Sequence, residues 1–199
     1  MTRRRGRPRA YETDVALRRA RDTFWAGGYS GTSLEALGAG MGMNRPSIYA
    51  AFGDKRALYL RAAAEYGQTS RAWLSTALAR PRSLHETLRA VYRYARDYYL
   101  AGGDAPRGCF LLGTAVAEAH GDADVQAIVE STLNSFTESF SERFERARCE
   151  GELSPHAPDA LAQIATAALN TISVRARTGA DAATLDAIID ATVDVICSR

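Results

Sequence analysis

The stretch Thr32–Lys55, TSLEALGAGMGMNRPSIYAAFGDK, predicts two short helices joined by a tight turn. Thr32 or Ser33 can cap the first helix with its hydroxyl group. We expect that helix to end near Gly42, because glycine adopts the positive φ that a tight turn requires. Asn44 can then cap the second helix. Two short helices connected in this way are typical of a helix-turn-helix, whose second helix enters the major groove of DNA.

The small and polar residues of this stretch indicate how such a motif would work. Gly38 lies where the first helix faces the second, and a residue without a side chain lets the two cross closely. Arg45 can read guanine through two hydrogen bonds, and Ser47 reads bases less selectively. Hydroxyl and ammonium groups such as those of Tyr49 and Lys55 suit phosphate contacts. The predicted DNA-binding residues of the motif are Thr32, Ser33, Asn44, Arg45, Pro46, Ser47, Tyr49 and Lys55.

The formal net charge of the chain, +2, conceals a strong asymmetry. Residues 1–61 carry 12 Lys/Arg against 5 Asp/Glu, whereas residues 62–199 carry 13 against 18. A basic head of this kind suits a polyanion such as DNA. The arm before the first helix adds Arg3, Arg4, Arg5 and Arg7. These arginines suit a narrow minor groove, or they raise affinity for any DNA by releasing counterions.

Three segments around the motif resemble the DNA-binding domain of the TetR/AcrR family of bacterial transcriptional regulators. They are Gly28-Tyr29 with Thr32–Leu34, then Asn44–Tyr49, then Phe52–Lys55. The resemblance covers about residues 10–60, in keeping with a short DNA-binding module. It implies a cytoplasmic homodimer that binds a palindromic operator, usually as a repressor, and that a small ligand releases.

The sequence predicts an all-α fold with about nine helices, since helical periodicity recurs along the chain and is broken at glycine and proline. We expect an N-terminal three-helix DNA-binding domain with its basic arm over residues 1–56. Residues 57–199 are expected to form a C-terminal helical bundle for ligand sensing and dimerisation. One helix is expected to run from Gly108 to His120.

The last two predicted helices carry wide apolar faces, which suggests a four-helix interface between two copies of the chain. The alternative is that these faces pack only within one chain. The residues predicted to form the dimer interface are Leu161, Ile164, Ala168, Ile172, Leu185, Ile189 and Val193.

Aromatic residues concentrate in the middle of the chain. Phenylalanines at helical spacing, as at 136, 140 and 144, are more typical of a core than of a pocket. Buried tyrosine hydroxyls need hydrogen-bond partners, and a mixed apolar and polar cavity can use them. The predicted ligand-binding residues are Trp73, Tyr92, Tyr99, Phe110, His120 and Phe140.

Cys109 opens a predicted helix two residues after Arg107, and both features would stabilise a thiolate. Cys109 is therefore a candidate oxidant or electrophile sensor, although a small buried residue would fit the same position. Three widely spaced cysteines favour a reducing cytoplasm over a disulfide framework or a zinc site. We expect no metal site, no cofactor and no membrane span, and the sequence contains no catalytic motif typical of an enzyme.

Overall fold

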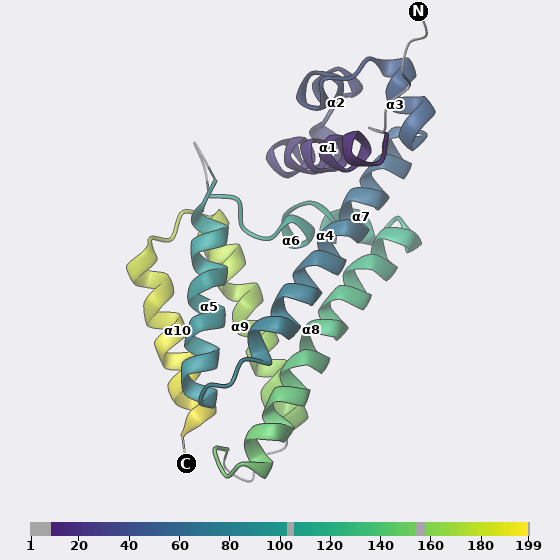
Figure 1. The fold of residues 1–199 in the computed structure, drawn as a ribbon. Helices are drawn as coiled ribbons and strands as arrows, with labels where there is room; N and C mark the ends of the chain where they lie inside the picture. Colours follow the sequence, from purple (N-terminus) through teal and green to yellow (C-terminus); the bar gives the residue numbers. More distant parts are fainter. Residues whose placement is uncertain (1–8, 103–105, 154–157, 199) are drawn as a thin grey trace, which may run out of the picture. The chain divides into compact units, whose positions relative to one another are not determined.

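The computed structural model describes residues 9–102, 106–153 and 158–198, and these residues form helices and no strand (Figure 1). The prediction of an all-α fold is confirmed. The helices are α1 (Arg9–Gly31), α2 (Leu34–Met41), α3 (Arg45–Phe52), α4 (Lys55–Leu78), α5 (Leu84–Leu100), α6 (Phe110–Thr114), α7 (Val116–Ala119), α8 (Ala123–Cys149), α9 (Pro158–Arg177) and α10 (Ala182–Cys197).

There is one helix more than predicted, because the segment expected as a single helix over 108–120 is divided into α6 and α7. The two short helices meet at Ala115, whose φ of −101° and ψ of −30° stay in the right-handed helical region but depart from the ideal helical φ of about −63°. Gly113 lies just before this break, and glycine weakens a helix through its backbone freedom. Neither short helix begins with a side-chain cap.

The chain separates into two compact units, residues 1–65 and residues 66–199. Helix α4 contributes to both, since residues 55–65 belong to the first unit and residues 66–78 to the second. The core of the first unit is apolar and includes fully buried Ala20, Phe24, Leu37, Ile48 and Leu58. The aromatic ring of Phe24 packs edge-on against Tyr59, with centroids 5.1 Å apart. These contacts hold α1, α2 and α3 together with the start of α4.

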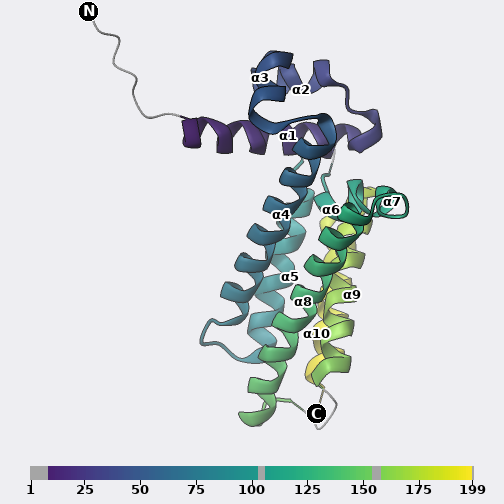
Figure 2. The same ribbon diagram turned by 90° about the vertical axis from the view of Figure 1, so that its right-hand side faces the viewer.

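In the second unit α5, α8, α9 and α10 run alongside one another (Figure 2). Helix α9 packs against each of the other three. The apolar faces that helical periodicity predicts for α9 and α10 close this bundle: Ile172 lies on α9, and Leu185, Ile189 and Val193 lie on α10, each fully buried.

One charged side chain lies inside the second unit, which the sequence analysis did not predict. Arg143 on α8 is 2% exposed, and its Nη2 donates to Glu152 Oε2 and to the carbonyl oxygen of Arg82, each at 3.1 Å. The same carboxylate oxygen accepts a hydrogen bond from the backbone N–H of Leu84 at 2.7 Å. Glu152 therefore ties α8 to the start of α5.

Candidate nucleic-acid interface and inner cavity

The segment between α2 and α3 has the geometry of a helix-turn-helix. Ser33 caps α2, its hydroxyl oxygen accepting from the N–H of Ala36 at 3.1 Å. Gly42 ends α2 in the left-handed region with φ 68° and ψ 32°. Asn44 caps α3, its Oδ1 accepting from the N–H of Ser47 at 2.9 Å. The cap of α2, the turn glycine and the cap of α3 therefore lie where the sequence predicts them.

Gly38 packs against the turn rather than against α3 itself. Its carbonyl oxygen accepts from the N–H of Met43 at 3.0 Å. A Cβ at Gly38 would lie 2.9 Å from the carbonyl oxygen of Met43. The prediction that this position must be small is confirmed, and the atom that requires it belongs to the backbone of the turn.

Helix α3 presents a polar face to solvent along its first two turns. Ile48 and Phe52 point into the core, whereas Arg45, Ser47 and Tyr49 are exposed, Tyr49 to 50%. Asn44 and Pro46, at the beginning of the helix, are exposed as well. This is the arrangement in which a recognition helix presents its N-terminal side chains to base edges.

Arg45 has an acidic neighbour in the preceding helix. Its Nη2 lies 3.5 Å from Glu35 Oε1, and both side chains are more than half exposed. An exposed pair of this kind adds little to stability, because water and salt screen it. The contact places the Arg45 guanidinium beside Glu35 in the first turn of α2.

Two predicted DNA-binding residues have other roles in the first unit. Thr32 is 3% exposed and its hydroxyl donates to the carbonyl oxygen of Gly28 at 2.6 Å, so its side chain stabilises the end of α1 and is not available to a phosphate. The ammonium of Lys55 lies over the ring of Tyr29, 4.6 Å from its centroid. Arg3, Arg4, Arg5 and Arg7 lie outside the described residues.

A groove of about 840 Å³ runs beside this face and includes Thr13 and Arg19 of α1 together with Ser47 of α3. Arg19 was not among the predicted contacts. The sequence does contain a signal for this residue, because Arg18 and Arg19 form a basic pair on an exposed face of the first helix. Such a pair suits phosphate contacts.

The second unit contains a separate cavity of about 190 Å³ among α4, α5, α8 and α9. Two of the six predicted ligand-binding residues, Trp73 and Tyr99, line it. The other nine lining residues were not predicted from the sequence. The full lining is Tyr66, Thr69, Ser70, Trp73, Leu74, Tyr94, Ala95, Tyr98, Tyr99, Phe136 and Leu169.

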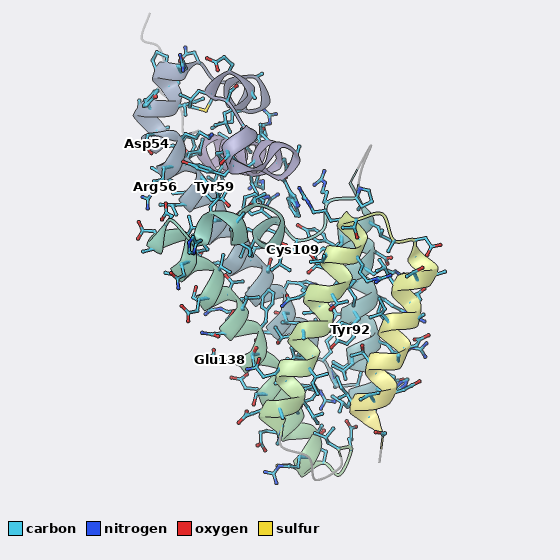
Figure 3. The ribbon with its side chains drawn as sticks, turned by 180° about the vertical axis from the view of Figure 1, so that it is seen from behind. Asp54, Arg56, Tyr59, Tyr92, Cys109 and Glu138 are labelled. Carbon is cyan, nitrogen blue, oxygen red and sulfur yellow. The ribbon has the colours of Figure 1, made fainter. Side chains whose placement is uncertain are left out.

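The remaining four predicted ligand-binding residues do not line this cavity. Tyr92 lies beside α9 (Figure 3), and its hydroxyl donates to the carbonyl oxygen of Ala165 at 3.0 Å. Phe140 stacks between Tyr92 and Phe144, and Phe110 packs against Tyr66. Tyr92, Phe110 and Phe140 are fully buried core residues, and His120 is exposed at the end of α7.

Two family models match the chain, one over each unit. Residues 16–62 match the bacterial regulatory proteins of the tetR family, and residues 77–192 match the tetracyclin repressor-like C-terminal domain. The chain belongs to the TetR family. The helix-turn-helix and the helical unit that follows it are therefore those of a DNA-binding transcriptional regulator.

Similar proteins agree with membership of the TetR family. The chain is 29% identical to the HTH-type transcriptional repressor ComR of Escherichia coli, covering 88% of this chain and 84% of ComR. It is 27% identical to YezE of Bacillus subtilis, an uncharacterized HTH-type transcriptional regulator, covering 96% and 99%. The chain is 30% identical in sequence to a cysteine mutant of the TetR family regulator CifR, whose structure was solved with 26-bp operator DNA. The two structures superpose with a TM-score of 0.78, covering 94% of this chain and 98% of that one.

Cys109 does not have the environment that the sequence analysis expected. It is 8% exposed, its backbone N–H donates to Ser173 Oγ at 2.7 Å, and its sulfur accepts from the hydroxyl of Tyr66 at 3.5 Å. Burial raises the pKa of the Cys109 thiol, although hydrogen bonds at the start of α6 oppose this effect. The prediction of a lowered pKa is wrong, because it took account of the helix start and Arg107 but not of desolvation.

The residues predicted for a dimer interface also need correction. Ile172, Leu185, Ile189 and Val193 are fully buried within a single TetR-family chain, so a second copy cannot reach them. Leu161 and Ala168 are 7% and 8% exposed, respectively. Ile164 alone of the predicted set is substantially exposed, at 47%.

Within the described residues, no three His, Cys, Asp or Glu side chains gather in a way that could hold a metal ion. The described helices include none with the length and apolar character needed to cross a membrane.

Proposed function

We propose that this TetR-family regulator is a dimeric repressor that binds a palindromic operator in the bacterial cytoplasm and leaves it when a small ligand occupies the cavity of the second unit. Relatives named as repressors support this proposal, as does the operator complex of CifR. The observation that carries it is the exposed polar start of α3, where Asn44, Arg45 and Ser47 share one accessible face while Ile48 anchors the helix.

Each exposed side chain of α3 suits a particular contact with DNA. Arg45 can donate two hydrogen bonds to guanine O6 and N7, which makes it the main base-reading residue of the proposal. Ser47 adds a weaker contact, and Tyr49 lies one turn beyond Arg45, where its hydroxyl suits a phosphate. Ser33 and Lys55 remain phosphate contacts in the proposal. The arm arginines Arg3, Arg4, Arg5 and Arg7 complete it as minor-groove or phosphate contacts.

Selection of bound sequences from a random DNA pool, followed by affinity measurements at several salt concentrations, tests operator binding. We expect the wild-type chain to select a palindrome. Arg45→Ala is expected to reduce the preference for that palindrome over scrambled DNA by about five- to 150-fold for each half-site, since a bidentate contact contributes about 1–3 kcal/mol of discrimination. Arg80→Ala, which removes an exposed arginine of the second unit, is the control.

The two variants distinguish reading of bases from general attraction to DNA. Arg80→Ala should keep the preference intact. Full preference in Arg45→Ala would reassign base reading to other residues of α3. Failure of the wild-type chain to prefer any sequence would refute the proposed function.

The dimer surface of the proposal is an exposed stripe on α9 and α10. Ile164 and Val174 on α9 and Val195 on α10 are exposed to 47%, 51% and 65%, respectively. Small residues continue the stripe between them at spacings of three and four, which lets another helix approach closely. The stripe comprises Ala160, Ile164, Ala167, Thr171 and Val174 on α9, with Thr184, Ile188, Ala191 and Val195 on α10.

Placing charge on this stripe should separate the copies. We expect the double variant Ile164→Glu with Val195→Glu to sediment as a monomer at concentrations where the wild-type chain is a dimer, because two carboxylates would be buried unpaired in each copy. Gln163→Glu, on the same helix at an exposed position outside the stripe, should remain dimeric. A dimeric double variant would contradict the assignment of this surface.

Ligand release requires the cavity to influence the DNA-binding unit. Helix α4 is a candidate for this coupling because one continuous helix contributes residues 55–65 to the first unit and, through Tyr66 and Trp73, lines the cavity of the second. In the proposal α4 adopts two positions, and the ligand binds more tightly to the one that does not suit DNA binding. Ligand binding then shifts the chain away from its DNA-binding form.

A further inference from the structure

The cavity of the second unit has a wall of connected aromatic rings. Trp73 of α4 stacks on Tyr94 of α5 with ring centroids 4.5 Å apart and an angle of 22° between the planes. Tyr94 lies nearly parallel to Tyr98 at 6.4 Å, and Tyr98 meets Tyr99 edge-on at 6.0 Å. Tyr94 and Tyr98 are 51% and 38% exposed, so the wall extends from the interior to the surface. Flat ring faces of this kind favour a flat partner.

The polar groups of the cavity are hydroxyls. Among the described residues that line it, none is Asp, Glu, Lys, Arg or His, whereas Thr69, Ser70 and four tyrosines are present. A charged ligand entering such a cavity would lose hydration without gaining an ionic partner, which costs several kcal/mol for a group left unpaired. The lining therefore selects for a ligand without formal charge.

The hydroxyl of Tyr99 is the candidate hydrogen-bonding group of this lining. Of the two buried tyrosines of the lining, Tyr66 donates its hydroxyl to Cys109 Sγ at 3.5 Å, whereas Tyr99, 8% exposed, has neighbouring groups but no hydrogen bond to its hydroxyl among the described residues. Burial raises the pKa of Tyr99 well above its ordinary value, so the group stays a neutral phenol that can donate or accept. The Tyr99 residue lines the cavity, so a ligand that pairs with its hydroxyl gains a hydrogen bond there.

The size of the cavity limits the ligand. Its volume is about 190 Å³, somewhat more than the roughly 150 Å³ of an apolar protein cavity that holds benzene. One ring, or two small fused rings, matches this space.

We propose that the cavity binds an uncharged, planar aromatic molecule of one or two fused rings whose oxygen or nitrogen atom pairs with the hydroxyl of Tyr99. This inference rests on the proposed function, in which the same cavity holds the releasing ligand. A lipophilic cation is the competing class, because the faces of Trp73 and Tyr94 also attract cations. The absence of any carboxylate among the lining residues favours the neutral class.

Calorimetric titration of the full-length protein, without DNA, tests the ligand class with β-naphthol as the probe. We expect β-naphthol to bind at least about tenfold more tightly than its charged counterparts, β-naphthoate and N-methylquinolinium, because neither charge finds a partner in the cavity. The saturated analogue decalol should also bind more weakly, since it cannot stack. Equal or tighter binding of N-methylquinolinium would overturn the proposal in favour of a cation site, and lack of binding by β-naphthol would overturn it outright.

A matched pair of Tyr→Phe variants on α5 locates the hydrogen bond. Tyr99→Phe is expected to weaken β-naphthol binding by about three- to tenfold, which is what one hydrogen bond contributes, and to leave naphthalene binding unchanged. Tyr92→Phe removes a hydroxyl that bonds Ala165 outside the cavity and should leave both affinities unchanged. Equal loss for β-naphthol and naphthalene in Tyr99→Phe would refute the role of the hydroxyl.

Operator release is measured separately, by adding β-naphthol to the preformed complex with the selected DNA. Tight binding of β-naphthol with a persistent operator complex supports the ligand class and contradicts the release step of the proposed function. If β-naphthol fails to bind but a charged ligand binds and releases the operator, the release step is supported and the proposed ligand class is overturned.

Discussion

Replacing Glu152 with alanine is expected to lower the free energy of unfolding by about 2–3 kcal/mol. The Arg143 side chain is 1% exposed, and Glu152 Oε2 is the one carboxylate oxygen among the described residues that pairs with it. No described group accepts from Nε or Nη1 of Arg143, so the carbonyl oxygen of Arg82, which accepts from Nη2, is its other described hydrogen-bond partner. Removing one partner of a buried pair costs about 3–5 kcal/mol, and the 30% exposure of the Glu152 side chain places this case at or below the lower end.

Glu152→Ala removes a second interaction as well. The N–H of Leu84 donates to the same carboxylate oxygen at 2.7 Å, and it belongs to the first turn of α5, where backbone donors lack partners within the helix. Urea unfolding followed by circular dichroism measures the change. Glu145→Ala is the matched control, because its i,i+3 pair with Arg148 lies half exposed on the same helix as Arg143 and should leave the midpoint unchanged within error.

Charge burial and lost contacts can be separated by a double variant. Arg143→Met with Glu152→Leu removes both charges at once, and such replacements are often close to neutral. We expect this double variant to recover most of the stability lost in Glu152→Ala. Equal midpoints for Glu152→Ala and Glu145→Ala would show that the buried pair contributes no more than an exposed one.

The parts of the fold that the sequence predicts well are those determined by local chemistry. Ser33 and Asn44 cap their helices as their side-chain oxygens allow, and Gly42 adopts the positive φ that its place in the turn requires. Such features depend on residues within four positions of one another, so a linear sequence contains the information they need. The helix-turn-helix is a short module built largely from them.

The faces of α9 and α10 show what the sequence leaves open. Helical periodicity identifies an apolar face but does not say whether the same chain or another covers it. The larger residues, Leu185, Ile189 and Val193, close the core of one chain, where filling space stabilises most. The exposed stripe is made largely of alanine, threonine and valine, which a search for large apolar residues passes over.

The cavity depends on helix positions that no local pattern reveals. Tyr92 and Tyr99 are two turns apart on α5, about 10.5 Å along its axis, and only Tyr99 reaches the cavity. Which of them does so depends on how far α5 is shifted along α4 and α8. On α4 the spacing of Tyr66, Ser70 and Trp73 places them on one face of the helix. This spacing could have identified Tyr66 and Ser70 as cavity residues together with Trp73.

Replacing Gly38 with valine is expected to weaken operator binding by about five- to 150-fold. A Cβ at this position would lie 2.9 Å from the carbonyl oxygen of Met43, an atom of the turn backbone. That carbonyl cannot rotate away as a side chain could, so α2 and the turn must separate. Overpacking of this kind costs about 1–3 kcal/mol, and a cost of 1.4 kcal/mol taken from binding is already tenfold in affinity.

The effect should fall on DNA binding because the turn positions the recognition helix. The N–H of Met43 bonds the Gly38 carbonyl at 3.0 Å, and Asn44, the cap of α3, follows Met43 directly in the chain. A shift of the turn therefore moves Arg45 and Ser47 relative to the groove that they read. Gly31→Ala is the control, because a Cβ at Gly31 meets no atom within 4 Å, and it should bind the selected operator like the wild-type chain.

Circular dichroism and fluorescence-anisotropy titration with the selected operator together check this prediction. The second unit contains α5 to α10 and all the α4 residues that line the cavity, so its helices should remain folded in Gly38→Val and ligand binding should persist. Loss of operator affinity with retained ligand binding would locate the defect in the turn. If Gly38→Val binds the operator with wild-type affinity, the turn accommodates a side chain at this position. The close approach of Gly38 to Met43 would then not determine the position of α3.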